Sequence, residues 1–139
     1  MRKIIFRGKD KKTGEWFFGN LYDKDIYGRT HIATTSKGCL NIDADTVGQF
    51  TGVYDDTDKK APIWEGDILE IIKINEDATS QKIDAVVKWL DIFGGFVVEG
   101  INKKGSIAPF SQVISDFIVY KKGNIYDNPE LLEGCKNGK

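Results

Sequence analysis

Two carboxylates flank a single glycine in the segment IWEGDIL, residues 63–69, and these side chains are the best placed in the sequence for chemistry. On an extended chain, residues two positions apart point to the same side, so Glu65 and Asp67 could share a divalent cation or act as an acid and a base. A metal-assisted hydrolase built on this pair needs a third ligand, for which Asp45 or Asp91 is available. A catalytic pair also needs a cleft and a polar third group, and the neighbouring sequence supplies neither.

The same segment has a complete interpretation as a turn before a strand. Gly66 would take a backbone angle that only glycine adopts at low cost, and Asp67 would accept backbone N–H groups at the start of the apolar run. Trp64 would then cover the end of the fold. Because Gly-Asp before an apolar run is typical of a turn, we favour this interpretation and predict no catalytic residue, no metal ion and no cofactor.

A second glycine motif, TVGQFTG at residues 46–52, has the Gly-x-x-x-Gly spacing of a loop that could hold a phosphate. Such a loop needs a helix N-terminus or a lysine directly after it, whereas here Val53 and Tyr54 continue as a strand. We therefore predict that Gly48 and Gly52 form a turn.

Histidine and cysteine are too sparse for a transition-metal centre. The chain has one histidine, His31, and two cysteines, Cys39 and Cys135, which lie far apart in sequence. A core of this size does not need a disulfide, so we predict reduced thiols. Residues 1–6, MRKIIF, contain too few apolar residues for a signal peptide or a membrane span, so a cytoplasmic protein is expected.

Charge is unevenly distributed although the net charge is only −1. Residues 1–14 carry six basic side chains against one acid, whereas residues 43–77 carry ten acids against three lysines. A basic face beside aromatic rings could bind an acidic partner or stack the bases of a single strand. The sequence pI of about 5.8 is well below that of a dedicated nucleic-acid binder, so a protein partner is preferred. The candidate partner-binding residues are Arg2, Lys3, Arg7, Lys9, Lys11, Lys12, Trp16 and Phe17.

Alternating apolar residues and turn glycines predict a mainly β fold. Residues 16–22, WFFGNLY, alternate with a two-residue period and are expected to pair with residues 4–7 in a first hairpin. RTHIATT and GCLNI, on either side of Gly38, predict a second hairpin. At least one of Phe17 and Phe18 must face outward unless both faces of this strand are covered.

The second half of the chain predicts a small barrel. An acidic loop at 54–62 is expected to be mobile and precedes the strands predicted at 67–74, 82–89, 95–101 and 116–122. The first of these is apolar on both faces, as a central strand is. We predict a single domain over 1–139, with N-terminal β-hairpins at 1–54 and an SH3-like curled barrel at 62–122.

Only the C-terminal region has helix signals. Asn128 is a good N-cap, Pro129 suits the first helical position, and Gly134 suits the end of a short helix over 128–134. One and a half turns are marginal alone, so Leu131 and Leu132 should dock on the sheet. Residues 135–139 are predicted to be a tail.

Four motifs occur in an order that resembles the YopX family, small proteins encoded in phage and prophage genomes. They are WFFGNL (16–21), TVGQFTG (46–52), IWEGDIL (63–69) and GNIYDNPELL (123–132). The resemblance implies a mainly β fold with a small barrel, a bacterial cytoplasm and an origin in a mobile element. It implies no catalytic residues, because the family has no established activity.

We therefore expect a non-catalytic binding module that contacts a protein or associates with itself as a homo-oligomer. Open sheet edges and outward aromatic residues favour such contacts. The alternatives are a nucleic-acid-binding barrel that uses the basic N-terminus and the hydrolase built on Glu65 and Asp67. No contact with a membrane is expected.

Overall fold

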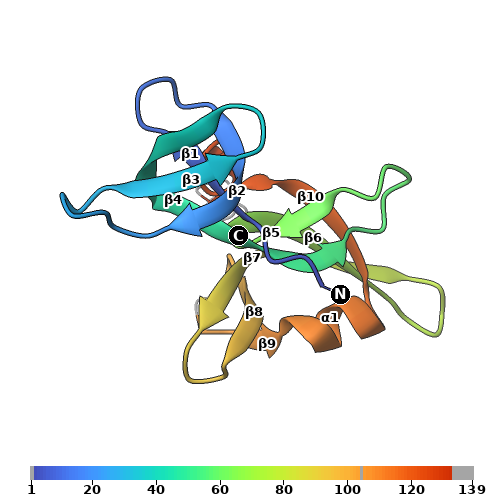
Figure 1. Cartoon of the computed structure of the whole chain (residues 1–139). Coiled ribbons are helices and arrows are strands. Elements are labelled where there is room, and N and C mark those ends of the chain that lie inside the picture. The colour runs from blue at the N-terminus through green and yellow to red at the C-terminus, as the bar shows by residue number, and fades with distance from the viewer. Residues whose placement is uncertain (1, 104, 133–139) are drawn as a thin grey trace. The chain divides into compact units, whose positions relative to one another are not determined.

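The computed structural model describes residues 2–103 and 105–132, and it confirms a mainly β protein. The chain divides into two compact units, Met1–Gly52 and Val53–Lys139. This boundary lies close to residue 54, where the N-terminal hairpins were predicted to end. Each unit is described separately below (Figure 1).

The first unit contains strands β1 (Phe6–Asp10), β2 (Trp16–Tyr22) and β3 (Thr30–Thr34) and most of β4 (Gly38–Tyr54). Both predicted hairpins are confirmed, because β1 pairs with β2 and β3 pairs with β4, each antiparallel. β2 also pairs with β3, and β1 also pairs with β4. The pairings therefore run from β1 through β2, β3 and β4 back to β1, so the four strands form a ring.

Two glycines allow the strands of this ring to approach closely. A Cβ atom on Gly19 would stand 2.1 Å from the carbonyl oxygen of Ala33, and one on Gly8 would stand 2.4 Å from Ile42 Cγ2. Ile32 and Ile42 are buried inside the ring. Glycine at positions 8 and 19 is therefore required by space rather than by a turn.

The prediction of a turn at TVGQFTG is wrong, because the whole segment is strand within β4. Gly48 pairs with Arg7 of β1, and Gly52 has a φ of +87° inside the strand. The Thr46 hydroxyl accepts the N–H of Lys9 at 2.8 Å, at the place where the β1–β4 register shifts. Both glycines thus lie in an irregular strand, which contains a bulge and a residue with a positive φ but does not turn back on itself.

The second unit contains β5 (Pro62–Trp64), β6 (Asp67–Ile74), β7 (Ser80–Leu90), β8 (Gly95–Gly100), β9 (Ile107–Pro109) and β10 (Ile118–Asn124). Five of these strands form a sheet in the order β10-β6-β7-β8-β9. The prediction of a central strand at 67–74 is confirmed, because β6 lies inside this sheet. The described pairings leave β10 and β9 at opposite edges and do not close the predicted SH3-like barrel.

The acidic loop after β4 is fastened to the β10 edge. Asp56 donates its N–H to the Val119 carbonyl and accepts the Val119 N–H on its carboxylate, both at 2.8 Å. Asp55 accepts the N–H of Lys121 at 3.0 Å. These bonds occupy backbone groups that a sheet edge otherwise exposes to other chains.

A helix that the sequence analysis missed, α1 (Phe110–Asp116), connects β9 to β10 (Figure 1). It buries Phe110 and Val113 against the core of the second unit, together with Leu69, Val87 and Val98. Seven residues with a β-branched valine and isoleucine give little helical signal, so packing stabilises this helix.

The predicted C-terminal helix is present in part. Residues Glu130–Leu132 are helical, while residues 133–134 and the predicted tail at 135–139, including Cys135, lie outside the described residues. The Asn128 side-chain oxygen accepts the N–H of Asn124 at 3.1 Å. Asn128 was predicted to cap the following helix, but its carboxamide closes the preceding turn instead.

Candidate functional site

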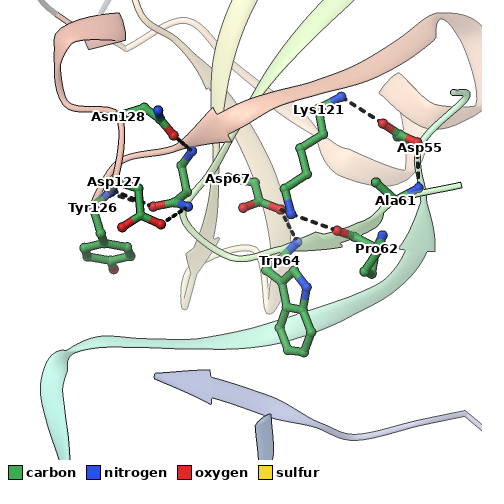
Figure 2. A network of polar contacts seen from close by, with 10 residues as sticks. Asp55, Ala61, Pro62, Trp64, Asp67, Lys121, Tyr126, Asp127 and Asn128 are labelled. Carbon is green, nitrogen blue, oxygen red and sulfur yellow. Dashed lines mark hydrogen bonds and ion pairs between the residues drawn. The ribbon is translucent and has the colours of Figure 1, made fainter. Parts of the chain in front are cut away.

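The turn between β5 and β6 has the geometry predicted for IWEGDIL (Figure 2). Gly66 has a φ of +91°, and the Trp64 N–H donates to Asp67 Oδ2 at 2.7 Å. Asp67 is completely buried, and Lys121 Nζ lies 3.2 Å from the same oxygen. Glycine is needed here because other residues are strained at positive φ, and the carboxylate is tolerated because a donor and a cation compensate its burial.

A second turn, at residues 124–128, is built in the same way. The Asn124 side-chain oxygen accepts the N–H groups of Tyr126 and Asp127, each at 2.9 Å, and its amide donates to Asp127 Oδ2 at 3.1 Å. Asn128 closes the turn by accepting the Asn124 N–H (Figure 2). Short polar side chains bonded to nearby backbone groups are the usual means of fixing such turns.

The two turns contact each other directly. The Ile125 N–H donates to the Gly66 carbonyl at 3.0 Å, and a Cβ atom on Gly66 would stand 3.1 Å from Tyr126 Cε2. Lys121 reaches the first turn from β10, since its ammonium contacts Asp67 and also donates to the Pro62 carbonyl at 3.2 Å. We call the two turns and Lys121 the turn clamp. It brings together two of the four sequence motifs, residues 63–69 and 123–132.

Asp55 supports the turn clamp from the adjacent loop. Its Oδ1 accepts the Ala61 N–H at 2.9 Å and also bonds Thr57, while its Oδ2 accepts the Lys121 N–H (Figure 2). Burial by itself raises the pKa of this carboxyl, but the bonds from the Thr57 hydroxyl and the three backbone N–H groups outweigh burial and lower its pKa. Asp55 is therefore held as a carboxylate inside the protein.

This geometry places Asp67 in the turn. Its carboxylate faces Trp64 and Lys121 in the interior, whereas Glu65, two residues earlier, is partly exposed. Within residues 2–103 and 105–132, no group of three or more His, Cys, Asp or Glu side chains could hold a metal ion. The turn clamp is a partly buried polar network, with Asp67 and Asn124 in its interior, and its bonds fix the backbone of both turns.

The predicted basic face is only partly on the surface. Arg2, Lys3, Lys11 and Lys12 are exposed, and Lys9 is partly exposed. Arg7, in contrast, is 4% exposed, and its guanidinium lies 4.4 Å from the centre of the Trp16 ring. Arg7 therefore contributes to packing in this structure.

Of the two adjacent phenylalanines of β2, Phe18 is the one that faces outward. It is half exposed, whereas Phe17 is partly buried, with the Lys37 ammonium 5.1 Å from its ring centre. The prediction that one of the two rings faces outward is confirmed. Phe17, which was a candidate partner-binding residue, is the less exposed of the two rings.

An apolar surface that the sequence analysis did not single out lies at the end of the β7–β8 hairpin. Ile92 is 88% exposed, Phe93 is 64% exposed and Trp89 is 43% exposed. We call Trp89, Ile92 and Phe93 the hairpin tip. Exposed apolar side chains are ordinary one at a time, but three within five residues form a patch of the kind that binds partners.

The hairpin tip is held in a defined conformation. Phe93 and Gly94 donate their N–H groups to the carbonyls of Leu90 and Asp91 at 3.1 and 3.0 Å. Trp89 donates its indole N–H to Asp91 Oδ1 at 2.8 Å and packs edge-to-face on Phe96, with ring centres 5.2 Å apart. The patch is thus presented on a fixed turn, which lowers the entropy cost of binding.

One signal in the sequence could have identified this tip. Residues 90–95, LDIFGG, place an isoleucine and a phenylalanine between two strands, directly before two glycines. Hairpin turns usually carry polar residues, so apolar residues at such a turn conflict with the local rule. Conflicts of this kind tend to mark functional positions.

The fold and the site together describe a mainly β protein with a partly buried polar clamp and an exposed apolar tip. A model of the YopX protein family matches residues 5–133, which is nearly the whole chain. The protein belongs to the YopX family. A search of curated proteins gave no match.

Proposed function

We propose that this protein is a non-catalytic binding module that contacts another protein through its hairpin tip. The observation that carries the proposal is the combination of high exposure and fixed geometry at Trp89, Ile92 and Phe93. Aromatic residues dominate the binding energy of protein interfaces, and a preformed turn avoids much of the ordering cost. Asp55 and Asp67, which are buried carboxylates of the second unit, accept backbone N–H groups.

The charges around the tip favour a protein over a lipid surface. Asp91 lies in the turn itself, and Lys88, the nearest basic residue in sequence, forms an ion pair with Glu99. Anionic lipids attract clusters of lysine and arginine, which this hairpin lacks between residues 89 and 100. None of the helices in the described residues is long and apolar enough to span a membrane.

A photo-crosslinking experiment tests the proposal with a matched control. A photoreactive phenylalanine analogue is placed at position 92 or at position 26 of the full chain expressed in bacteria. Ile92 and Ile26 are 88% and 91% exposed, so the two probes are equally accessible but belong to different units. We expect discrete protein adducts from position 92 and none of the same species from position 26.

A second substitution separates binding from simple exposure. Phe93→Ser should remove the adducts formed from position 92, because it deletes the neighbouring ring without altering the turn hydrogen bonds. Tyr27→Ser, a similarly exposed ring in the other unit, should leave them unchanged. Equal adducts from both probe positions, or adducts that survive Phe93→Ser, would contradict the proposal.

Nucleic acid is the second candidate, because exposed aromatic and basic residues share one face of β1 and β2. Phe18 and Tyr22 are exposed on the same side of β2 as Trp16, which pairs with Lys9 of β1. Bases stack on such rings, and phosphate contacts make binding fall steeply with salt. If this candidate is correct, gel retardation of single strands at low salt is expected to disappear in Phe18→Ser. Absence of retardation at low salt removes the candidate.

The proposed setting is the cytoplasm of a bacterium that carries a phage or prophage. Membership of the YopX family supports this setting through the mobile-element origin expected from the four sequence motifs. Detection of the protein in the soluble fraction of such a host, after induction of the prophage, would test it.

A further inference from the structure

The second unit contains an apolar pocket that the proposed function does not use. It has a volume of about 170 Å³ and lies where α1 meets the face of the sheet formed by β6, β7 and β8. Its walls include Ile71, Ala85, Val98, Val113 and Phe117. We call it the α1 pocket.

The size and the walls of the α1 pocket suit one phenyl ring. Apolar cavities of about 150 Å³ inside proteins stay dry and bind benzene. The exposed side chains of Ile83 and Ile107 line the same pocket, so apolar surface continues outward from it. A ring that enters the pocket would therefore also bring its neighbours against an apolar rim.

The chain itself carries an exposed phenyl ring that could enter such a pocket, the ring of Phe93. Phe93 stands on the fixed hairpin tip and is exposed, as are Trp89 and Ile92 of the same tip. The charges are complementary as well, because Asp91 accompanies Phe93 and the exposed Lys73 lines the pocket. Opposite charges beside an apolar contact favour the correct register.

A tip cannot fill the pocket of its own chain. Ile83, at the pocket, and Trp89, at the tip, lie six residues apart on the same strand, β7. A strand rises about 3.3 Å per residue, so the two sites are roughly 20 Å apart along a rigid sheet. A contact between tip and pocket would therefore join two molecules and use a different surface on each.

We infer that the hairpin tip of one copy inserts Phe93 into the α1 pocket of a second copy. The inference rests on the proposed function, since it names a second copy of this chain as the partner of the tip. A head-to-tail contact of this kind leaves one tip and one pocket unused, so copies can add in a row or close into a ring. A single inserted ring buries a small area, which gives weak association that depends on concentration.

Sedimentation equilibrium of the full chain tests the inference at concentrations from about 10 μM to about 1 mM, the range in which small interfaces associate. The weight-average mass should rise with concentration for the wild type and reach at least twice the monomer mass. Phe93→Ser removes the ring and Ile83→Asp places a carboxylate at the rim, and each variant alone should stay monomeric. Both positions are exposed, so both variants should fold, and circular dichroism checks this.

The decisive experiment is to mix the two variants. Phe93→Ser keeps an intact pocket and Ile83→Asp keeps an intact tip, so an equimolar mixture should form dimers and nothing larger. Tyr27→Ser, a control in the other unit, should associate as the wild type does. A wild type that stays monomeric throughout, association that survives both variants, or a mixture without dimers would each overturn the inference.

These outcomes are distinguishable from failure of the proposed function. If the wild type is monomeric but position 92 still crosslinks to another protein, the second copy is not the partner and the tip remains a binding surface. If position 92 gives no adducts either, the proposed function fails as well.

Discussion

The turn clamp and the hairpin tip lie in the same unit and invert the usual distribution of side chains between buried and exposed positions. At the clamp, the carboxylate of Asp67 is completely buried and bonded to Trp64 and Lys121. At the tip, Ile92 and Phe93 stand in solvent while Phe93 and Gly94 donate their backbone N–H groups within the turn. A buried charge needs partners and an exposed ring does not. Substitution should therefore cost stability at the turn clamp and binding at the hairpin tip.

The largest stability effect is expected at Asp67. Asp67→Ala leaves the Trp64 N–H and the Lys121 ammonium without this acceptor and should lower the free energy of unfolding by about 3 kcal/mol. Glu65→Ala, two residues away and partly exposed, should change it by less than about 1 kcal/mol. Urea unfolding of both variants provides the measurement.

A metal site would order these two variants differently. Two carboxylates that repel each other without a metal ion would make both Glu65→Ala and Asp67→Ala more stable than the wild type. A rise in melting temperature for both variants that disappears when Mg²⁺ or Mn²⁺ is added would contradict the assignment of Asp67 to the turn.

The next largest effect is expected at Gly66. Gly66→Ala combines a φ of +91° with a Cβ atom 3.1 Å from Tyr126 and should cost about 2 kcal/mol. Gly94 offers a matched control, because its φ is also positive, at +61°, but a Cβ atom added there would have no neighbour within 4 Å. Gly94→Ala should cost only about 1 kcal/mol. Equal costs in thermal melts would show that the contact with Tyr126 does not matter.

Asp55 should make stability depend on pH. Its pKa is lowered in the folded protein, so its stabilising contribution is complete above the unfolded pKa of about 4 and is lost as the pH falls through the lower folded value. Asp55→Asn should therefore cost about 1 kcal/mol near neutral pH, and this difference should shrink in strong acid. Urea titrations of both proteins at several pH values provide the comparison, and a difference independent of pH would contradict it.

The smallest effect on stability is expected at the hairpin tip. Ile92→Ser and Phe93→Ser remove exposed side chains, so each should shift the free energy of unfolding by no more than about 0.5 kcal/mol. The same variants should abolish the contacts proposed for the tip. A loss of stability as large as that of Gly66→Ala would show that these side chains belong to the core.

Local patterns in the sequence predicted both N-terminal hairpins, the central strand at 67–74 and the turn at Gly66 and Asp67. They succeeded because period-two alternation and glycine-containing turns depend on residues close in sequence. The TVGQFTG segment misled the same reasoning, because both glycines lie within β4, where Gly48 pairs with Arg7 of β1 and Gly52 has a positive φ.

The sequence by itself determined the mainly β class, the family and the chemistry of the turn before β6. Only the tertiary structure decided that Lys121, more than fifty residues away, accompanies Asp67, and that Arg7 packs on Trp16. It also decided the short helix α1, which is held by its contacts with the sheet. These features depend on contacts between distant residues, and such contacts leave no periodic signal in a single sequence.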